Sequence, residues 1–198
     1  MENPEKYLAV LVEIKRRVKV IDDIITADSR LRYRATSIET ACLQIRKVLE
    51  LIAFGSLIAN VRIYSAQHRK FAEHWNPKLM LKDMARVNPN FYPYPIIQKP
   101  SAVSGIDMNW IAREQDFLTK DDFLLAYEKC GGIMHAANPY GAITDFSAYQ
   151  TDLIQWRRKI VNLLNAHTME LVEDDLMYLF QMGAGDNSPT YHEFRIVK

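Results

Sequence analysis

The sequence predicts a mainly α-helical fold, an antiparallel bundle of about four long helices that ends in a small antiparallel β-meander. Apolar residues recur at alternating spacings of three and four over long stretches, the pattern of helices that bury one face. After His167 the pattern changes to short β-like runs separated by turn-forming residues. The chain has 198 residues, the size of one domain, so we expect 1–198 to form a single domain.

The first helix is predicted to begin after Asn3, because asparagine is a good N-cap and Pro4 suits the first helical position. Its apolar residues form one packing face: Tyr7, Leu11, Ile14, Val18, Ile21 and Ile25. Four basic residues fall mostly outside that face: Lys15, Arg16, Arg17 and Lys19. We interpret them as a solvent-exposed face, and contact with phosphate groups is the alternative.

A second, longer helix is expected from about Ala35 to Gln67. Its middle, VLELIAFGSLIANV, is apolar nearly all round, which predicts burial from several sides. The small residues around Gly55 would let a neighbouring helix cross closely. Glu50 is the one acid in this run, and we expect it to pair with Arg46 one turn earlier instead of serving as a catalytic carboxylate.

Residues 68–118 interrupt the helical pattern and are predicted to be an insertion. Asn76-Pro77 announces a short helix, and we expect the following NPNFYPYPIIQKP to be an ordered loop. The next segment, DMNWIAREQDF, fits either a short strand or an extended connection. The aromatic residues of this insertion are interpreted as clamps that hold a loop to the core, with stacking on bases as the alternative.

A helix is predicted between Thr119, which opens a capping-box pattern, and the Asn138-Pro139 stop. Gly131-Gly132 inside it costs about 1 kcal/mol per glycine, so close packing or a kink is expected there. Helical geometry would place His135 above the bare backbone of Gly131. We expect His135 and Asn138 to line a concave site or a subunit interface formed with the last helix. The alternative is a packed core or interface histidine.

The last long helix is predicted to start at Thr144 or Asp145. The β-like runs Met169–Val172, Met177–Gln181 and Tyr191–Val197 then predict a β-meander over 168–198. Net charge is only +1, but residues 1–90 carry +6 and residues 91–198 carry −5. This asymmetry favours attraction between the halves within one fold, and it also allows a basic surface for an acidic partner. The candidate nucleic-acid contacts are Arg157, Arg158 and Lys159, on the last helix.

The first residues, MENPEK, lack the features of a secretory signal. The longest apolar run, Val48–Val61, is shorter than the ~20 residues that a membrane helix needs, so we expect a cytoplasmic protein without a membrane segment. Cys42 and Cys130 are interpreted as buried, reduced thiols. We expect no metal and no other cofactor, because the histidines are scattered at His68, His74, His135, His167 and His192.

Three segments, LQIRKVLELIA, YEKCGGIMH and WRRKIVNLLN, together resemble the HEPN superfamily of helical bundles. The resemblance covers the helical core and leaves out the insertion and the C-terminal strands. Nuclease members carry Arg, four to six residues, then His, and cleave RNA without a metal. Arg62 to His68 and Arg69 to His74 match that spacing, but at the end of the second helix. Upstream of His135 the position of the arginine is held by Lys129.

We therefore expect a HEPN-like, non-catalytic interaction or nucleic-acid-associated protein whose partner is RNA or a protein. The alternative is a metal-independent ribonuclease of a toxin or defence system. In that alternative His135 is the general acid or base, Lys129 stabilises the phosphate and Asn138 donates to the substrate. We also expect a homodimer, and a structural homodimer without a ligand is the third alternative, since exposed faces of long helices often pair isologously.

Overall fold

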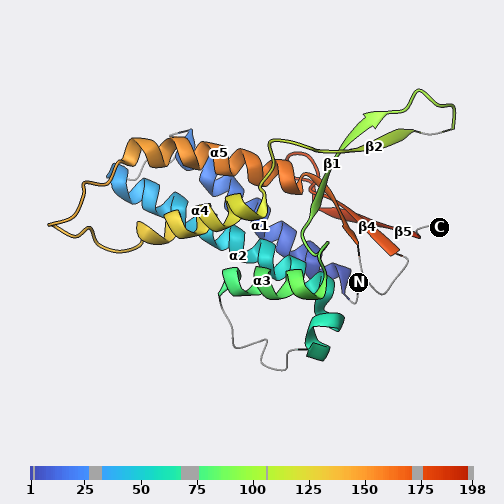
Figure 1. Cartoon of the computed structure of the whole chain (residues 1–198). Coiled ribbons are helices and arrows are strands. Elements are labelled where there is room, and N and C mark those ends of the chain that lie inside the picture. Colours follow the sequence, from blue (N-terminus) through green and yellow to red (C-terminus); the bar gives the residue numbers. More distant parts are fainter. Residues whose placement is uncertain (2, 27–32, 68–75, 106, 171–175, 196–198) are drawn as a thin grey trace.

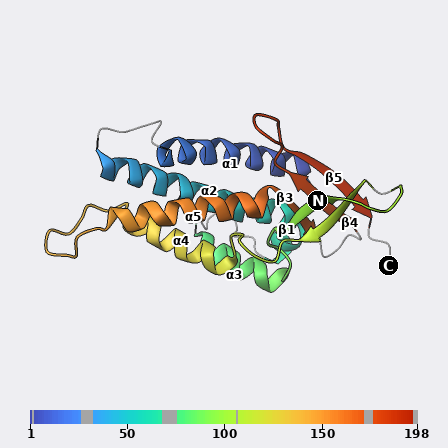
Figure 2. The ribbon, with the colours of Figure 1, turned by 90° about the horizontal axis from the view of Figure 1, so that it is seen from above.

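The computed structural model describes residues 1, 3–26, 33–67, 76–105, 107–170 and 176–195 (Figure 1). Its helices are α1 (Pro4–Ile25), α2 (Arg34–Gln67), α3 (Pro77–Val87), α4 (Lys120–Gly132) and α5 (Phe146–Leu164). Its strands are β1 (Tyr94–Pro100), β2 (Met108–Ala112), β3 (Ala166–Glu170), β4 (Leu176–Gln181) and β5 (Thr190–Arg195). Figures 1 and 2 show α1, α2, α4 and α5 side by side, with the sheet at one end of these helices.

The described strands form one antiparallel sheet in the order β2-β1-β3-β4-β5. β1 joins its two parts, because Tyr94 and Pro95 pair with β3 while residues 96–100 pair with β2. Beyond this junction the β1–β2 hairpin extends away from the helices (Figure 1). Among the described residues, none of the helices combines the length and the apolarity that crossing a membrane requires.

This architecture shows that the predicted fold class was wrong. The described residues hold five helices of 11 to 34 residues and a five-stranded sheet, in place of about four long helices and a small C-terminal meander. Two strands, β1 and β2, come from within the predicted insertion 68–118. Prolines hid β1, because proline lacks the N–H group that a strand usually donates. Pro95 still accepts through its carbonyl oxygen, from the Arg113 N–H at 3.0 Å.

The predicted helix starts are confirmed by side chains that accept hydrogen bonds from the first turn. Asn3 caps α1, Asn76 caps α3 and Asp145 caps α5. Thr119 and Asp122 form a reciprocal capping box at the start of α4. Each cap satisfies backbone N–H groups that have no partner inside the helix, which fixes where the helix begins.

The predicted end of α4 is wrong, because the helix stops at Gly132 instead of continuing to Asn138. The N–H of Met134 turns back to the carbonyl of Gly131, 3.2 Å away, and closes a tight turn. Two adjacent glycines weaken the last helical turn, so this turn replaces further helix. His135 consequently lies in the segment after α4, where its side chain is exposed.

The core joins the helices to one face of the sheet. Tyr7 of α1 is the central contact, since its ring centroid lies 4.3 Å from that of Phe180 in β4. Its hydroxyl bonds to Nε2 of His167 in β3 at 2.8 Å. Gly55 of α2 faces the same ring, and a Cβ atom there would lie 3.1 Å from Tyr7 Cε2. The small residue expected at a close helix crossing therefore accommodates Tyr7.

Candidate functional site

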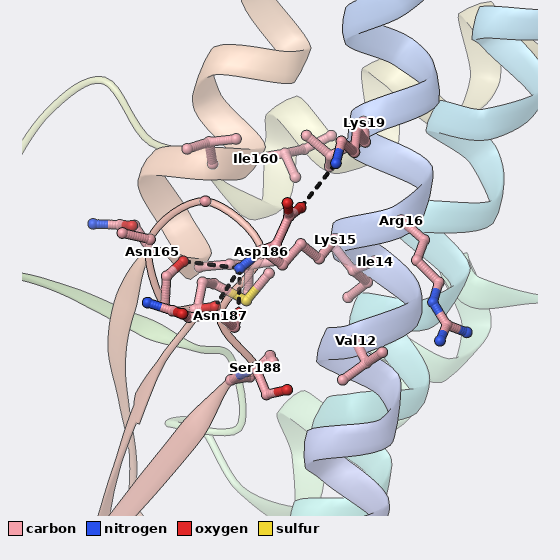
Figure 3. Close-up of a pocket in the computed structure, with 18 of the residues that line it drawn as sticks. Val12, Ile14, Lys15, Arg16, Lys19, Ile160, Asn165, Asp186, Asn187 and Ser188 are labelled. Atoms are coloured by element: carbon pink, nitrogen blue, oxygen red, sulfur yellow. Dashed lines mark hydrogen bonds and ion pairs between the residues drawn. The ribbon is translucent and has the colours of Figure 1, made fainter.

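A groove of about 790 Å³ lies between α1, α5 and the loop 182–189 that joins β4 to β5 (Figure 3). We call it the α1–α5 groove. Apolar side chains contribute much of its lining: Val12, Ile14, Val18, Ile160, Val161, Leu164 and Met182. Its charged lining residues are Lys15, Arg16, Lys19, Asp22, Arg157 and Asp186. Its volume is that of a typical ligand site, and basic groups outnumber acidic ones.

Lys15 fastens the loop 182–189 to α1. Its Nζ donates to the carbonyl oxygens of Met182 and Gly183, both at 2.9 Å, and of Asn187 at 2.6 Å. Three acceptors match the three donors of an ammonium group. Gly183 has a φ of +71°, and a Cβ atom there would lie 2.9 Å from the carbonyl oxygens of Asn187 and Ser188. A glycine is therefore required at this position, and the loop wraps around a single cation.

Lys15→Met should lower the free energy of unfolding by about 2 kcal/mol, because three carbonyl groups lose a charged hydrogen-bond donor. It should also make residues 183–188 a preferred site of limited proteolysis. Lys19→Met is the matched control, since its ion pair is exposed to solvent and should contribute little to stability. Urea unfolding and mass mapping of proteolytic fragments measure both effects. Equal losses in the two variants would contradict this role of Lys15.

The other basic side chains of the groove make fewer hydrogen bonds than Lys15. Lys19 pairs with Asp186 at 2.9 Å, and their side chains are 69% and 93% exposed. A hydrogen bond from Lys19 lowers the pKa of Asp186, and the same bond raises the pKa of Lys19. Arg157 binds Asp22 through two bonds, at 2.5 and 2.6 Å. In Figure 3 Arg16 extends from the side of α1 that faces away from the loop 182–189, and 76% of its side chain is exposed.

The three candidate nucleic-acid contacts on α5 point to different partners. Arg157 binds Asp22 of α1, Arg158 binds Asp116 at 2.8 Å and Lys159 binds Asp122 of α4 at 2.7 Å. Burial acts to raise the pKa of Asp122, but hydrogen bonds from Lys159 and Thr119 hold that pKa below its usual value. Consecutive residues in a helix point about 100° apart, so these cations form no common patch. Of the three, Arg157 lines the α1–α5 groove.

The three predicted catalytic residues have different neighbours in the structure. His135 lines a hollow of about 340 Å³ whose other walls are Ile133, Met134, Ala136 and residues 39–43 of α2, instead of the last helix. Lys129 is paired with Asp152 of α5, and that hydrogen bond raises the pKa of Lys129. Asn138 accepts a hydrogen bond from the Tyr140 N–H at 3.0 Å.

The space beside the bare backbone of Gly131 is filled by a side chain of α2. A Cβ atom on Gly131 would lie 2.6 Å from Nη1 of Arg46. Arg46 donates to the Tyr127 hydroxyl at 2.7 Å, and that hydroxyl donates to Glu50 at 3.3 Å. Arg46 and Glu50 approach to 3.9 Å, which confirms the predicted ion pair. The close packing inferred from the glycines is therefore the contact between α2 and α4.

Sequence reasoning missed the role of His167. It is fully buried in β3, and its pKa is lowered to about 4 by burial, although a hydrogen bond to the Leu164 carbonyl acts to raise it. The signal was present in the strand AHTME, where His167 shares a face with the core residue Met169. The buried cysteines, Cys42 and Cys130, are free thiols.

Comparisons with family models, curated proteins and solved structures found no match. Within the described part of the chain, no three side chains of His, Cys, Asp or Glu gather as a metal site would require. The residues His68, Arg69 and His74, in the two matches to the nuclease spacing, lie outside the described residues.

Proposed function

We propose that this chain is a HEPN-like, non-catalytic, cytoplasmic protein whose α1–α5 groove holds the sugar–phosphate backbone of RNA. The observation that supports the proposal is the meeting of Arg157, from α5, with Lys15 and Lys19 of α1 around one groove, while Arg16 reaches solvent from the other side of α1. Lysine and arginine side chains are the usual partners of phosphate groups. Both basic segments singled out in the sequence thus contribute to one surface.

Two of these cations have side chains accessible to a phosphate. Arg16 is mostly exposed, and its contact with Glu13 is long, at 3.9 Å. Within the described residues, Asp186 is the one hydrogen-bond partner of Lys19, and both side chains face solvent. Because exposed ion pairs contribute little stability, a phosphate can take the place of Asp186. Lys15 remains bound to its three carbonyl groups and adds positive charge, whereas Arg157 remains paired with Asp22 and shapes the groove.

The ribonuclease alternative requires His135 and Lys129 to act on the same phosphate. Lys129 faces α5 and is bound to Asp152, while His135 lies beside the start of α2. These different surroundings support a binding role over catalysis.

Replacing both Arg16 and Lys19 by alanine should weaken RNA binding and flatten its salt dependence. For single-stranded RNA each phosphate contact adds about 0.7 to the slope of log K against log salt, so the slope should fall by about 1.4. Fluorescence anisotropy with a labelled single-stranded RNA, titrated at several NaCl concentrations, measures both quantities.

The matched control carries Lys47→Ala and Lys78→Ala, which remove the same charge from exposed positions on α2 and α3. It should keep the wild-type slope. An equal fall in the control would show that net charge alone is measured. No binding by the wild-type chain at low salt would overturn the RNA proposal and leave a protein partner as the alternative.

A further inference from the structure

The two edge strands of the sheet differ in chemistry. β5, TYHEFR, carries Glu193 and Arg195, and charged residues discourage other strands from pairing with an edge. β2, MNWIA, carries neither a charged residue nor a proline. Its apolar side chains are open to solvent, with Met108 46%, Trp110 37% and Ile111 44% exposed. An uncharged, exposed edge of this kind invites another strand.

The register with β1 determines which backbone groups of β2 point outward. The N–H of Arg113 donates to the Pro95 carbonyl, so the backbone groups of Arg113 point toward β1. Backbone groups alternate along an antiparallel strand, which turns the N–H and C=O groups of Met108, Trp110 and Ala112 away from β1. Within the described residues β2 pairs with β1 alone. Three residues thus present their backbone groups for pairing with a further strand.

We propose that β2 pairs with β2 of a second copy of this chain, antiparallel about a two-fold axis centred on Trp110. This register places Met108 opposite Ala112 of the second copy and brings the two Trp110 side chains together. A large side chain then faces a small one, and two aromatic rings meet at the centre. The outward groups form about six backbone hydrogen bonds, because each hydrogen-bonded pair exchanges two.

A second copy fits this edge better than an unrelated strand for two reasons. The neutral strand meets no like charge when it faces itself. Trp110 is also held in place beforehand, since its ring packs edge-on against Phe194 with centroids 4.7 Å apart. A positioned aromatic residue loses little side-chain freedom on binding. The two-fold pairing closes the assembly, because only the charged β5 edges remain.

The register is tested with two single variants, Asn109→Cys and Ile111→Cys, which leave Trp110 in place. In the proposed pairing position 109 faces position 111 of the second copy, with Cα atoms about 4.5 Å apart, within reach of a disulfide. Like positions lie about 7–8 Å apart, which is too far. Under mild oxidation a mixture of the two variants should give about fivefold more disulfide-linked dimer than either variant alone. The native cysteines are buried and do not interfere.

Equal cross-linking in all three samples, or none in the mixture, would overturn the proposed register. A second measurement removes one outward donor by Met108→Pro, which leaves the β1–β2 bonds intact. Sedimentation should show a concentration-dependent wild-type dimer whose Kd rises at least about tenfold in this variant. Ile143→Ser, at an apolar position 98% exposed, is the control and should leave the Kd unchanged. A wild-type chain that stays monomeric would overturn the proposal, whatever the outcome for RNA binding.

Discussion

Replacing Tyr7 by alanine should lower the free energy of unfolding by about 4 kcal/mol. The side chain is 2% exposed, and the loss of a buried aromatic ring costs about 3–5 kcal/mol. Its contacts with Phe180 and His167 join α1 to the sheet, so few neighbouring groups can move in to fill the cavity. Urea unfolding followed by circular dichroism measures this loss.

Two control variants separate the stability contributed by the Tyr7 ring from that of its hydroxyl and from the effect of removing an exposed tyrosine. Tyr7→Phe keeps the ring but leaves Nε2 of buried His167 without its donor, so we expect a loss of about 1–2 kcal/mol. Tyr140→Ala removes a tyrosine that is 97% exposed and should change stability by less than about 0.5 kcal/mol. A loss below about 1 kcal/mol for Tyr7→Ala would show that Tyr7 does not join the two layers.

Helix starts were predictable from the sequence because their cause is local. Asn3, Asn76 and Thr119 each accept a hydrogen bond from a residue two or three positions later, so neighbouring letters suffice to find them. The packing face of α1 was predictable for a similar reason, and its residues from Tyr7 to Ile21 are buried as a set. Helical spacing alone determines which residues share that face.

The sheet and the end of α4 depend on contacts that local patterns do not contain. Tyr94 of β1 pairs with Thr168, far along the chain, and the prolines of β1 weaken its own strand signal. Apolar spacing continues past Gly132, so it cannot report that the backbone turns after the two glycines. Tertiary pairing and backbone entropy override the periodic pattern at these two places.

At the candidate site, too, local features were predictable from the sequence and long-range contacts were not. Charge clusters on α1 and α5 were visible in the sequence, and their residue types favour phosphate contacts. The sequence did not reveal that Arg157 and Lys19 border one groove, since this depends on how α1 and α5 pack. It also gave no sign that Arg158 and Lys159 each bind an acid on another segment.

His167 is neutral in the folded protein at pH 7 because its burial outweighs the hydrogen bond to the Leu164 carbonyl, which acts to raise its pKa. Its Nδ1 donates to the Leu164 carbonyl at 3.0 Å, since a carbonyl oxygen can only accept. The Tyr7 hydroxyl then donates to Nε2, which must be unprotonated to accept. Complete burial disfavours the charged imidazolium and is the largest cause of the lowered pKa, about 4.

This lowered pKa predicts a loss of stability in acid. In the unfolded chain His167 takes up a proton below its ordinary pKa of 6.5, whereas in the folded protein it does so only near pH 4. Its contribution is therefore present above pH 6.5 and is lost as the pH falls toward 4, by about 3 kcal/mol in total. His167→Gln cannot take up this proton, so subtracting its pH profile from that of the wild type removes the carboxylates common to both. Urea unfolding between pH 7.5 and 4 should give a difference that falls with pH by about this amount, and parallel profiles would show that His167 is not the titrating group.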